Sequence, residues 1–103
     1  MALLNFKRKS DETPANAGVE RFLLNYSIEV MPRTAEKVED FRALLPENTR
    51  VYIAHIDGTP IEDMVATAKR LASDGFQVMP HFPARIIQNA DTLADWIARY
   101  QGE

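Results

Sequence analysis

Three short apolar stretches with β-strand character recur along this chain at a spacing of about 25 residues, and this spacing limits the folds available to it. They begin near Tyr26, Val51 and Phe76, and each is followed by a helical pattern. Strands that alternate with helices at this spacing predict parallel pairing, because parallel strands are joined by long crossover connections. The sequence therefore predicts an α/β fold of three successive parallel βα units.

Turn-forming residues separate the predicted strands and mark where they stop. Pro32 ends the first strand, because proline lacks the N–H that a sheet ladder uses. Asp57 and Gly58 are typical of a turn and end the second strand, and Pro80 follows the third. The predicted strands span residues 26–31, 51–56 and 76–79.

Helical periodicity fills both intervals between the strands. A first helix is predicted to begin at Thr34 and to end at Pro46. The second has the spacing of a capping box at residues 59–62 (TPIE), and Gly75 suits its left-handed cap. The residues predicted to face the core are Val38, Phe41, Leu44 and Leu45 in the first helix, and Ile61, Met64, Val65, Ala68, Leu71 and Ala72 in the second.

A third helical pattern follows the last strand, after a loop at residues 82–88. Asn89 or Asp91 is predicted to cap it, because both side chains accept hydrogen bonds from a first helical turn. Its buried face is predicted to carry Leu93, Trp96, Ile97 and Tyr100.

The first 25 residues differ from the rest of the chain. Residues 1–14 are polar and charged without sustained periodicity, and we expect them to form a flexible tail. Four large apolar residues then predict a short helix, within residues 15–25, that covers one end of the core: Val19, Phe22, Leu23 and Leu24. The predicted organisation is an N-terminal tail with this helix at 1–25 and a partial (βα)3 barrel segment at 26–103.

Composition excludes several classes of function. The 103 residues are 46% hydrophobic with a net charge of -3, so we expect one globular domain and no nucleic-acid partner, which would need a basic face. The absence of cysteine excludes disulfides, zinc–thiolate sites and thiol nucleophiles, and no metal-ligand spacing is recognisable. No apolar run approaches the roughly 20 residues of a spanning helix, and no secretory signal is recognisable. We therefore expect a cytoplasmic protein without a membrane partner.

The number of βα units bears on how the sheet is completed. A further strand is expected just beyond residue 101, whereas a closed barrel needs eight units and about 250 residues. We therefore expect the chain to resemble the first part, three-eighths, of a (β/α)8 TIM barrel. The alternative is a small open sheet that completes itself by forming a homo-oligomer, because unpaired strand edges are a liability.

Alternation along the strands predicts which polar residues share a face. Val30 and Val78 belong to the apolar set that packs on the helices, so the residues between them point the other way. Glu29 and His81 then lie together near the carboxyl ends of their strands, where parallel barrels and open α/β sheets keep their sites. The polar residues predicted on this inward face are Ser27, Glu29, Gln77 and His81.

Each candidate also has an ordinary structural explanation. Glu29 alone fits a sheet-end carboxylate in water, and His81 alone fits a side chain that satisfies a loop carbonyl. Arg85, in the loop after the third strand, fits a salt-bridge partner. On the second strand an inward Ala54 turns His55 toward the helices or the following loop. Glu29 and His81 form the stronger pair, because strand end and parity agree for both.

Two of these stretches resemble motifs of the methylenetetrahydrofolate reductases. Residues 27–33 (SIEVMPR) resemble the opening strand of that family, and residues 80–85 (PHFPAR) are similar to the Pro-His motif on its third strand. The helix between the motifs, over residues 60–74, is also similar. The resemblance covers roughly residues 26–103 and rests on the order and separation of the two motifs.

The resemblance implies an eight-stranded barrel that binds FAD. Members of the methylenetetrahydrofolate reductase family reduce 5,10-methylenetetrahydrofolate to 5-methyltetrahydrofolate. In this reaction hydride passes from a nicotinamide, NAD(P)H, through the flavin. A folate substrate and a place in one-carbon and methionine metabolism follow from the same resemblance. Most of the family's flavin-binding residues lie on later strands, so we expect residues 1–103 alone to be inactive.

The resemblance also implies roles for individual residues. Glu29 matches the family's catalytic glutamate, an acid that assists opening of the bridging methylene, and a half-buried carboxyl suits this role. His81 matches a histidine that contacts the flavin, and Arg85 has a weaker counterpart facing an anionic group. Ala54 and His55 occupy positions where the family carries threonine and tyrosine in contact with nucleotide or flavin, which indicates a divergent member.

Two other functions compete with this one. The chain fits a small non-enzymatic α/β module that assembles with copies of itself or completes a partner subunit, because a sheet of three strands leaves unpaired edges. It also fits the start of another barrel enzyme, since that fold hosts many reactions.

Overall fold

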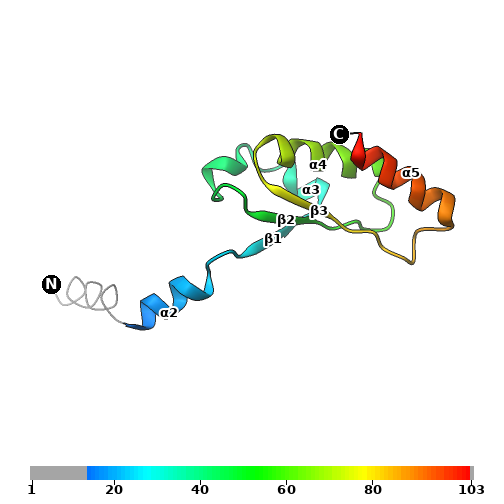
Figure 1. Cartoon of the computed structure of the whole chain (residues 1–103). Coiled ribbons are helices and arrows are strands. Elements are labelled where there is room, and N and C mark those ends of the chain that lie inside the picture. Colours follow the sequence, from blue (N-terminus) through cyan, green and yellow to red (C-terminus); the bar gives the residue numbers. More distant parts are fainter. Residues whose placement is uncertain (1–13, 103) are drawn as a thin grey trace.

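The computed structural model describes residues 14–102, so the predicted tail at 1–14 lies, except for its last residue, outside the described residues. A parallel sheet forms one layer and the helices that follow its strands form a second (Figure 1). None of the helices in the described range has the length and apolar character needed to cross a membrane. The elements are α2 (Pro14–Phe22), β1 (Ser27–Val30), α3 (Pro32–Ala35), the 3-10 helix η1 (Phe41–Ala43), β2 (Arg50–Ile53), α4 (Ile61–Ser73), β3 (Gln77–Pro80) and α5 (Ala90–Gln101).

The three strands form one open sheet in the order β1-β2-β3, and both pairings are parallel. This confirms the predicted α/β fold of three successive parallel βα units. In the register, Glu29 lies opposite Tyr52, and Tyr52 lies opposite Met79. Within the described residues β1 and β3 each have one strand neighbour, so both outer edges of the sheet are unpaired.

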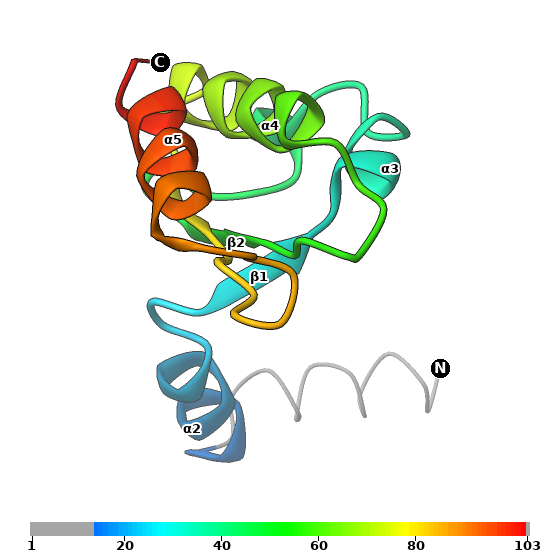
Figure 2. The same ribbon diagram turned by 90° about the vertical axis from the view of Figure 1, so that its right-hand side faces the viewer.

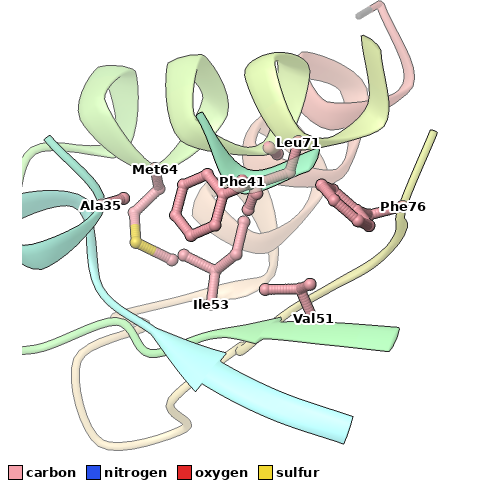
Figure 3. Packing of buried hydrophobic residues seen from close by; sticks show 8 residues of the cluster. Ala35, Phe41, Val51, Ile53, Met64, Leu71 and Phe76 are labelled. Carbon is pink, nitrogen blue, oxygen red and sulfur yellow. The ribbon is translucent and has the colours of Figure 1, made fainter. Parts of the chain in front are cut away.

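The core lies between the sheet and α4. Val51 and Ile53 on the central strand are fully buried and face Met64 and Leu71 of α4 (Figure 3). Full burial of a side chain of this size stabilises the fold by about 1.5–3 kcal/mol. The other buried members of this cluster are Ala35, Phe41, Ala68 and Phe76.

The opposite side of the sheet is not covered by a described helix, and we call it the open face (Figure 2). Alternation turns every second residue of each strand toward it, as the sequence predicts for Ser27, Glu29 and Gln77. All of its residues are exposed except Tyr52, which is half-buried. The open face consists of Ser27, Glu29, Arg50, Tyr52, Gln77 and Met79.

The prediction of one helix from Thr34 to Pro46 is wrong. The chain instead forms the short α3, a bend, and the 3-10 helix η1. Thr34 does not begin α3 but lies inside its first turn, where its Oγ1 accepts from the Met31 N–H and donates to the Met31 carbonyl. Asp40 begins η1 by accepting a hydrogen bond from the Arg42 N–H. Leu44, predicted to face the core, is exposed.

Arg70 of α4 explains why one continuous helix does not form. Its Nη1 donates to the Ala35 carbonyl at 2.8 Å, and its Nη2 donates to the Val38 carbonyl. An uninterrupted helix would use these carbonyls for its own N–H groups four residues later. The guanidinium also lies 4.9 Å from the ring centroid of Phe41, so it holds the bend and η1 together.

The start of α4 also differs from the sequence prediction. The helix begins at Ile61, and Pro60 precedes it without a side-chain cap, so the predicted capping box is wrong. The Thr59 carbonyl interacts with His55 Nε2 at 3.0 Å, and the Glu62 carboxylate lies 3.3 Å from Arg99 Nη1 on α5. At the other end the prediction is confirmed, since Gly75 has a φ of +92°.

The N-terminal helix is present, but it does not cover the core. In both views α2 lies beyond β1, on the side of the sheet away from α4 (Figures 1 and 2). The large apolar residues of α2 and those just after it are exposed, and Phe22 is 85% exposed. The predicted covering of one end of the core is therefore wrong for Val19, Phe22, Leu23 and Leu24.

The last helix, α5, packs along α4 and is capped by Asn89, whose Oδ1 accepts from the Thr92 N–H. One of the two predicted caps, Asn89, is thereby confirmed. Tyr100 lies on the inner face of α5. Its hydroxyl is buried and has no hydrogen-bond partner among residues 14–102. Burial raises the pKa of Tyr100 from 10.0 to about 12.

This shift predicts a stability difference in alkaline solution. Since the folded-state pKa of Tyr100 lies above the unfolded value, its contribution is complete below pH 10 and is lost as the pH rises toward 12. We expect wild type to lose stability relative to Tyr100→Phe across this interval, and Tyr100→Phe to be at least as stable at neutral pH. Urea unfolding at a series of pH values measures both, and parallel pH profiles would contradict the expectation.

Candidate functional site

The candidate site lies at the carboxyl end of the sheet, on the open face. Glu29 comes from β1, Tyr52 from β2, and His81 directly follows β3. The His81 N–H donates to the Ile53 carbonyl at 2.9 Å, so the chain keeps its sheet register for one residue beyond β3. Alternation then turns His81 to the same face as Glu29.

Glu29 and His81 approach each other across the central strand. Glu29 Oε1 lies 3.6 Å from His81 Nε2, a distance at which the two form an ion pair when the imidazole is protonated. The side chains are 59% and 43% exposed, so Glu29 is more open to water than the half-buried carboxyl that the sequence predicts. An ion pair this exposed contributes little to stability, typically about 0–1 kcal/mol. Its structural value is that both groups are held at one place.

Tyr52 completes this group, and the sequence reasoning missed it. It is the residue of β2 paired with Glu29, and its ring centroid lies 5.8 Å from that of His81. The signal was available in the alternation, because Val51 and Ile53 are apolar residues that turn Tyr52 to the open face. We call Glu29, Tyr52 and His81 the carboxyl-end cluster.

The carboxyl-end cluster combines an acid, an imidazole and an aromatic ring within reach of solvent. A carboxyl group and an imidazole at this separation can each give or take a proton from a bound molecule. Tyr52 and the neighbouring Met79 add an apolar surface on which a flat ring can rest. Such an arrangement suits acid–base chemistry on a planar substrate or cofactor.

Ala54 lies at the margin of the cluster. Together with Glu29 it lines a hollow of about 400 Å³ whose other walls come from the end of β1, from α3 and from the bend after α3. A small side chain at this position leaves the hollow open beside the Glu29 carboxylate. The lining residues are Glu29, Val30, Met31, Thr34, Val38 and Ala54.

His55 is not part of the cluster. It is buried on the helical side of the sheet, where its ring centroid lies 4.9 Å from that of Trp96 on α5. Its Nε2 interacts with the Thr59 carbonyl, while its Nδ1 has no partner among residues 14–102. The alternation predicted that His55 turns either toward the helices or toward the following loop, and in the structure it turns toward the helices. A contact with the cofactor stays a prediction.

Arg85 lies on the exposed loop between β3 and α5. No ion pair or hydrogen bond holds its guanidinium within the part of the chain that the structure describes. The salt bridge that would give Arg85 a purely structural role is therefore not formed with any described residue. Its predicted contact with an anionic group stays untested.

The described residues hold no group of three or more acidic, histidine or cysteine side chains that could bind a metal ion. A scan of the sequence against models of known protein families finds no match.

Proposed function

We propose that this chain forms the opening βα units of a flavoprotein that resembles the methylenetetrahydrofolate reductases, with the carboxyl-end cluster at its active site. The observation that carries the proposal is the 3.6 Å approach of Glu29 Oε1 to His81 Nε2. The two residues come from the two motifs that resemble this family, some fifty positions apart in sequence. They lie together at the carboxyl end of a parallel sheet, which is the end where barrel enzymes have their active sites.

Glu29 supplies the acid in this proposal. Opening of the methylene bridge produces an iminium that accepts hydride, and this step requires protonation of the departing amine nitrogen. The carboxyl of Glu29 is exposed on the open face, so a substrate resting there can reach it. His81, 3.6 Å away, orients the carboxyl and offers a second polar contact.

The open face fits a flat ring system. FAD, when bound, supplies the hydride transfer of this chemistry, and NAD(P)H is the proposed electron donor. Tyr52 and Met79 would provide the apolar bed and His81 a polar contact at its border. Ala54 keeps the adjoining hollow open, and Arg85 lies on a loop beyond the same strand ends.

The unpaired edges of β1 and β3 agree with a sheet that continues. Parallel strands in α/β proteins are covered on both faces, either by helices or by the rest of a barrel. In this structure the described helices cover one face alone, and the open face carries the candidate residues. Further βα units would enclose Glu29 and His81 and supply the remaining contacts to flavin and folate.

The test replaces Glu29 in the product of the complete open reading frame. We expect Glu29→Gln to bind FAD as wild type does, measured by flavin fluorescence, while reduction of methylenetetrahydrofolate falls by about 10²–10⁴-fold. Glu47→Gln is the matched control, because Glu47 is exposed at the opposite, amino end of the sheet. It should leave both measurements unchanged. Residues 1–103 alone are expected to bind FAD weakly or not at all.

Two outcomes would overturn the proposal in different ways. A complete product that neither binds FAD nor reduces methylenetetrahydrofolate removes the reductase function. If the Glu29→Gln variant of the complete product binds FAD and keeps full turnover, Glu29 has no catalytic role. That result would favour a different barrel enzyme.

A second candidate function, a non-enzymatic module that assembles with copies of itself or a partner subunit, rests on a separate observation. Met79 is 44% exposed on the open face, in the outer strand β3, whose far edge is unpaired within the described residues. Exposed apolar groups next to a free strand edge favour association. Sedimentation tests both candidates, because a compact, folded monomer of residues 1–103 without ligand counts against assembly and against a fragment of a larger barrel.

A further inference from the structure

Two Asp-Gly pairs occur in the described chain, and the structure treats them differently. Asp57–Gly58 follows β2, and Asp74–Gly75 follows α4. Both glycines have a φ of +92°, and nothing lies within 4 Å of the position that a Cβ would take on either. The φ of the glycine and the space at its Cβ position are therefore the same at both pairs, and the pairs differ in the hydrogen bonds and charges around the reacting groups.

Neither reacting group of Asp57–Gly58 is held by another residue. The pair occupies the centre of a turn closed by the Thr59 N–H, which donates to the Ile56 carbonyl at 2.9 Å. Both residues are exposed. Among residues 14–102 no acceptor takes the Gly58 N–H, and no cation or donor contacts the Asp57 carboxylate.

Both reacting groups of Asp74–Gly75 are held. The Gly75 N–H donates to the Ala72 carbonyl at 3.0 Å. The Asp74 carboxylate is 22% exposed and lies 3.8 Å from Arg42 Nε. The Asn48 N–H also donates to the Gly75 carbonyl at 3.2 Å, so Gly75 is hydrogen-bonded through both its N–H and its carbonyl.

We propose that Asp57 is a site of spontaneous covalent modification, at which the Asp57–Gly58 linkage isomerises to isoaspartate. The Gly58 amide nitrogen attacks Cγ of the protonated Asp57 carboxyl, forming a C–N bond and expelling one water, which takes a carboxyl oxygen and the amide proton. The product is a cyclic succinimide. Water then adds to the main-chain carbonyl carbon and breaks its bond to the Gly58 nitrogen. Mass and oxidation state are unchanged.

The modification changes the loop beside the candidate site. Isoaspartate adds one methylene to the main chain of the turn, while Thr59 is tied to both Ile56 and His55. The added length therefore displaces the turn or breaks the 3.0 Å contact between His55 Nε2 and the Thr59 carbonyl. Trp96, the one tryptophan of the chain, stacks on His55 and so reports this change in its fluorescence.

The experiment ages the full chain at neutral and mildly acidic pH and then maps the two sites after digestion with trypsin. Cleavage after Arg50, Lys69 and Arg85 places Asp57 and Asp74 on different peptides. Isoaspartate is identified in each peptide by electron-transfer fragmentation and by methyl transfer from S-adenosylmethionine with a protein isoaspartyl methyltransferase. In the folded chain we expect Asp57 to isomerise at least about fivefold faster than Asp74. Asp74 must first break the hydrogen bond of the Gly75 N–H, and the energy of one such bond corresponds to a factor of about five in rate.

Two controls make the result decisive. In denaturant both pairs lose their contacts, so their rates should become similar. Asp57→Glu keeps the charge and the turn but disfavours the five-membered ring, so it should abolish modification at this site and the accompanying change in Trp96 fluorescence. Equal rates at Asp57 and Asp74 in the folded chain, or modification of Asp57 only in denaturant, would overturn the proposal.

Discussion

Replacement of Ile53 by alanine is expected to lower the free energy of unfolding by about 3–4 kcal/mol. Ile53 is fully buried on the central strand and packs against Met64 of α4 (Figure 3). Removal of its outer carbons forfeits their transfer free energy and leaves a cavity that the sheet and α4 can close only in part. The free energy of unfolding of a small domain is roughly 5–15 kcal/mol in total, so this variant loses a large share of its stability.

Ile56→Ala is the matched control for Ile53→Ala. Ile56 lies three residues further on the same chain segment and is 52% exposed, so its truncation should change the free energy of unfolding by about 0.5 kcal/mol or less. Urea unfolding followed by far-ultraviolet circular dichroism measures both variants, and an unchanged dependence on urea would show that the denatured state is unaltered. Equal destabilisation by the two substitutions would contradict the placement of Ile53 in the core.

The arrangement of the sheet and the meeting of Glu29 with His81 were predictable from sequence for a common reason. Side-chain alternation along a strand has a period of two, so once Val30 and Val78 are assigned to the core, no choice remains for their neighbours. The spacing of the units makes the strands parallel and brings their carboxyl ends to one edge. Both inferences rest on local pattern combined with a strong geometric rule.

The segment after β1 was predicted wrongly because its structure depends on a distant residue. Phe41 and Leu45 do show helical spacing, and one of them, Phe41, is buried as expected. The interruption comes from Arg70, which lies 35 positions beyond Ala35 and takes that residue's carbonyl. No periodicity within residues 34–46 records such a contact. The capping box at Thr59 fails for a local reason, because the Thr59 N–H donates to the Ile56 carbonyl rather than to the Glu62 side chain.

Tyr52 was missed for a different reason. Its neighbours Val51 and Ile53 indicate its direction, but a tyrosine in a strand is an ordinary packing residue until the opposite face is known to be open. The structure supplies that knowledge, because no described helix covers the face that Tyr52 shares with Glu29. The aromatic member of the candidate site therefore depends on tertiary structure, and the acid and imidazole do not.

Replacement of Arg70 by methionine tests how far one side chain determines the path of the segment between β1 and β2. The half-buried guanidinium donates to the carbonyls of Ala35 and Val38 and stacks on Phe41. Hydrogen bonds from a charged donor contribute about 1.5–3 kcal/mol each, and methionine keeps most of the apolar stem while removing all of them. We expect the free energy of unfolding to fall by about 3 kcal/mol.

Arg99→Met is the matched control for Arg70→Met. Arg99 of α5 is 44% exposed, and its partners are the exposed carboxylates of Asp95 on the same helix and Glu62 on α4. Exposed ion pairs of this kind contribute about 0–1 kcal/mol, so this variant should remain close to wild type in urea unfolding. Hydrogen exchange gives a local readout: in Arg70→Met the amides between α3 and η1 should lose protection before those of β2. If Arg70→Met and Arg99→Met proved equally stable, the bend after α3 would have to be held by the local Asp40 cap alone.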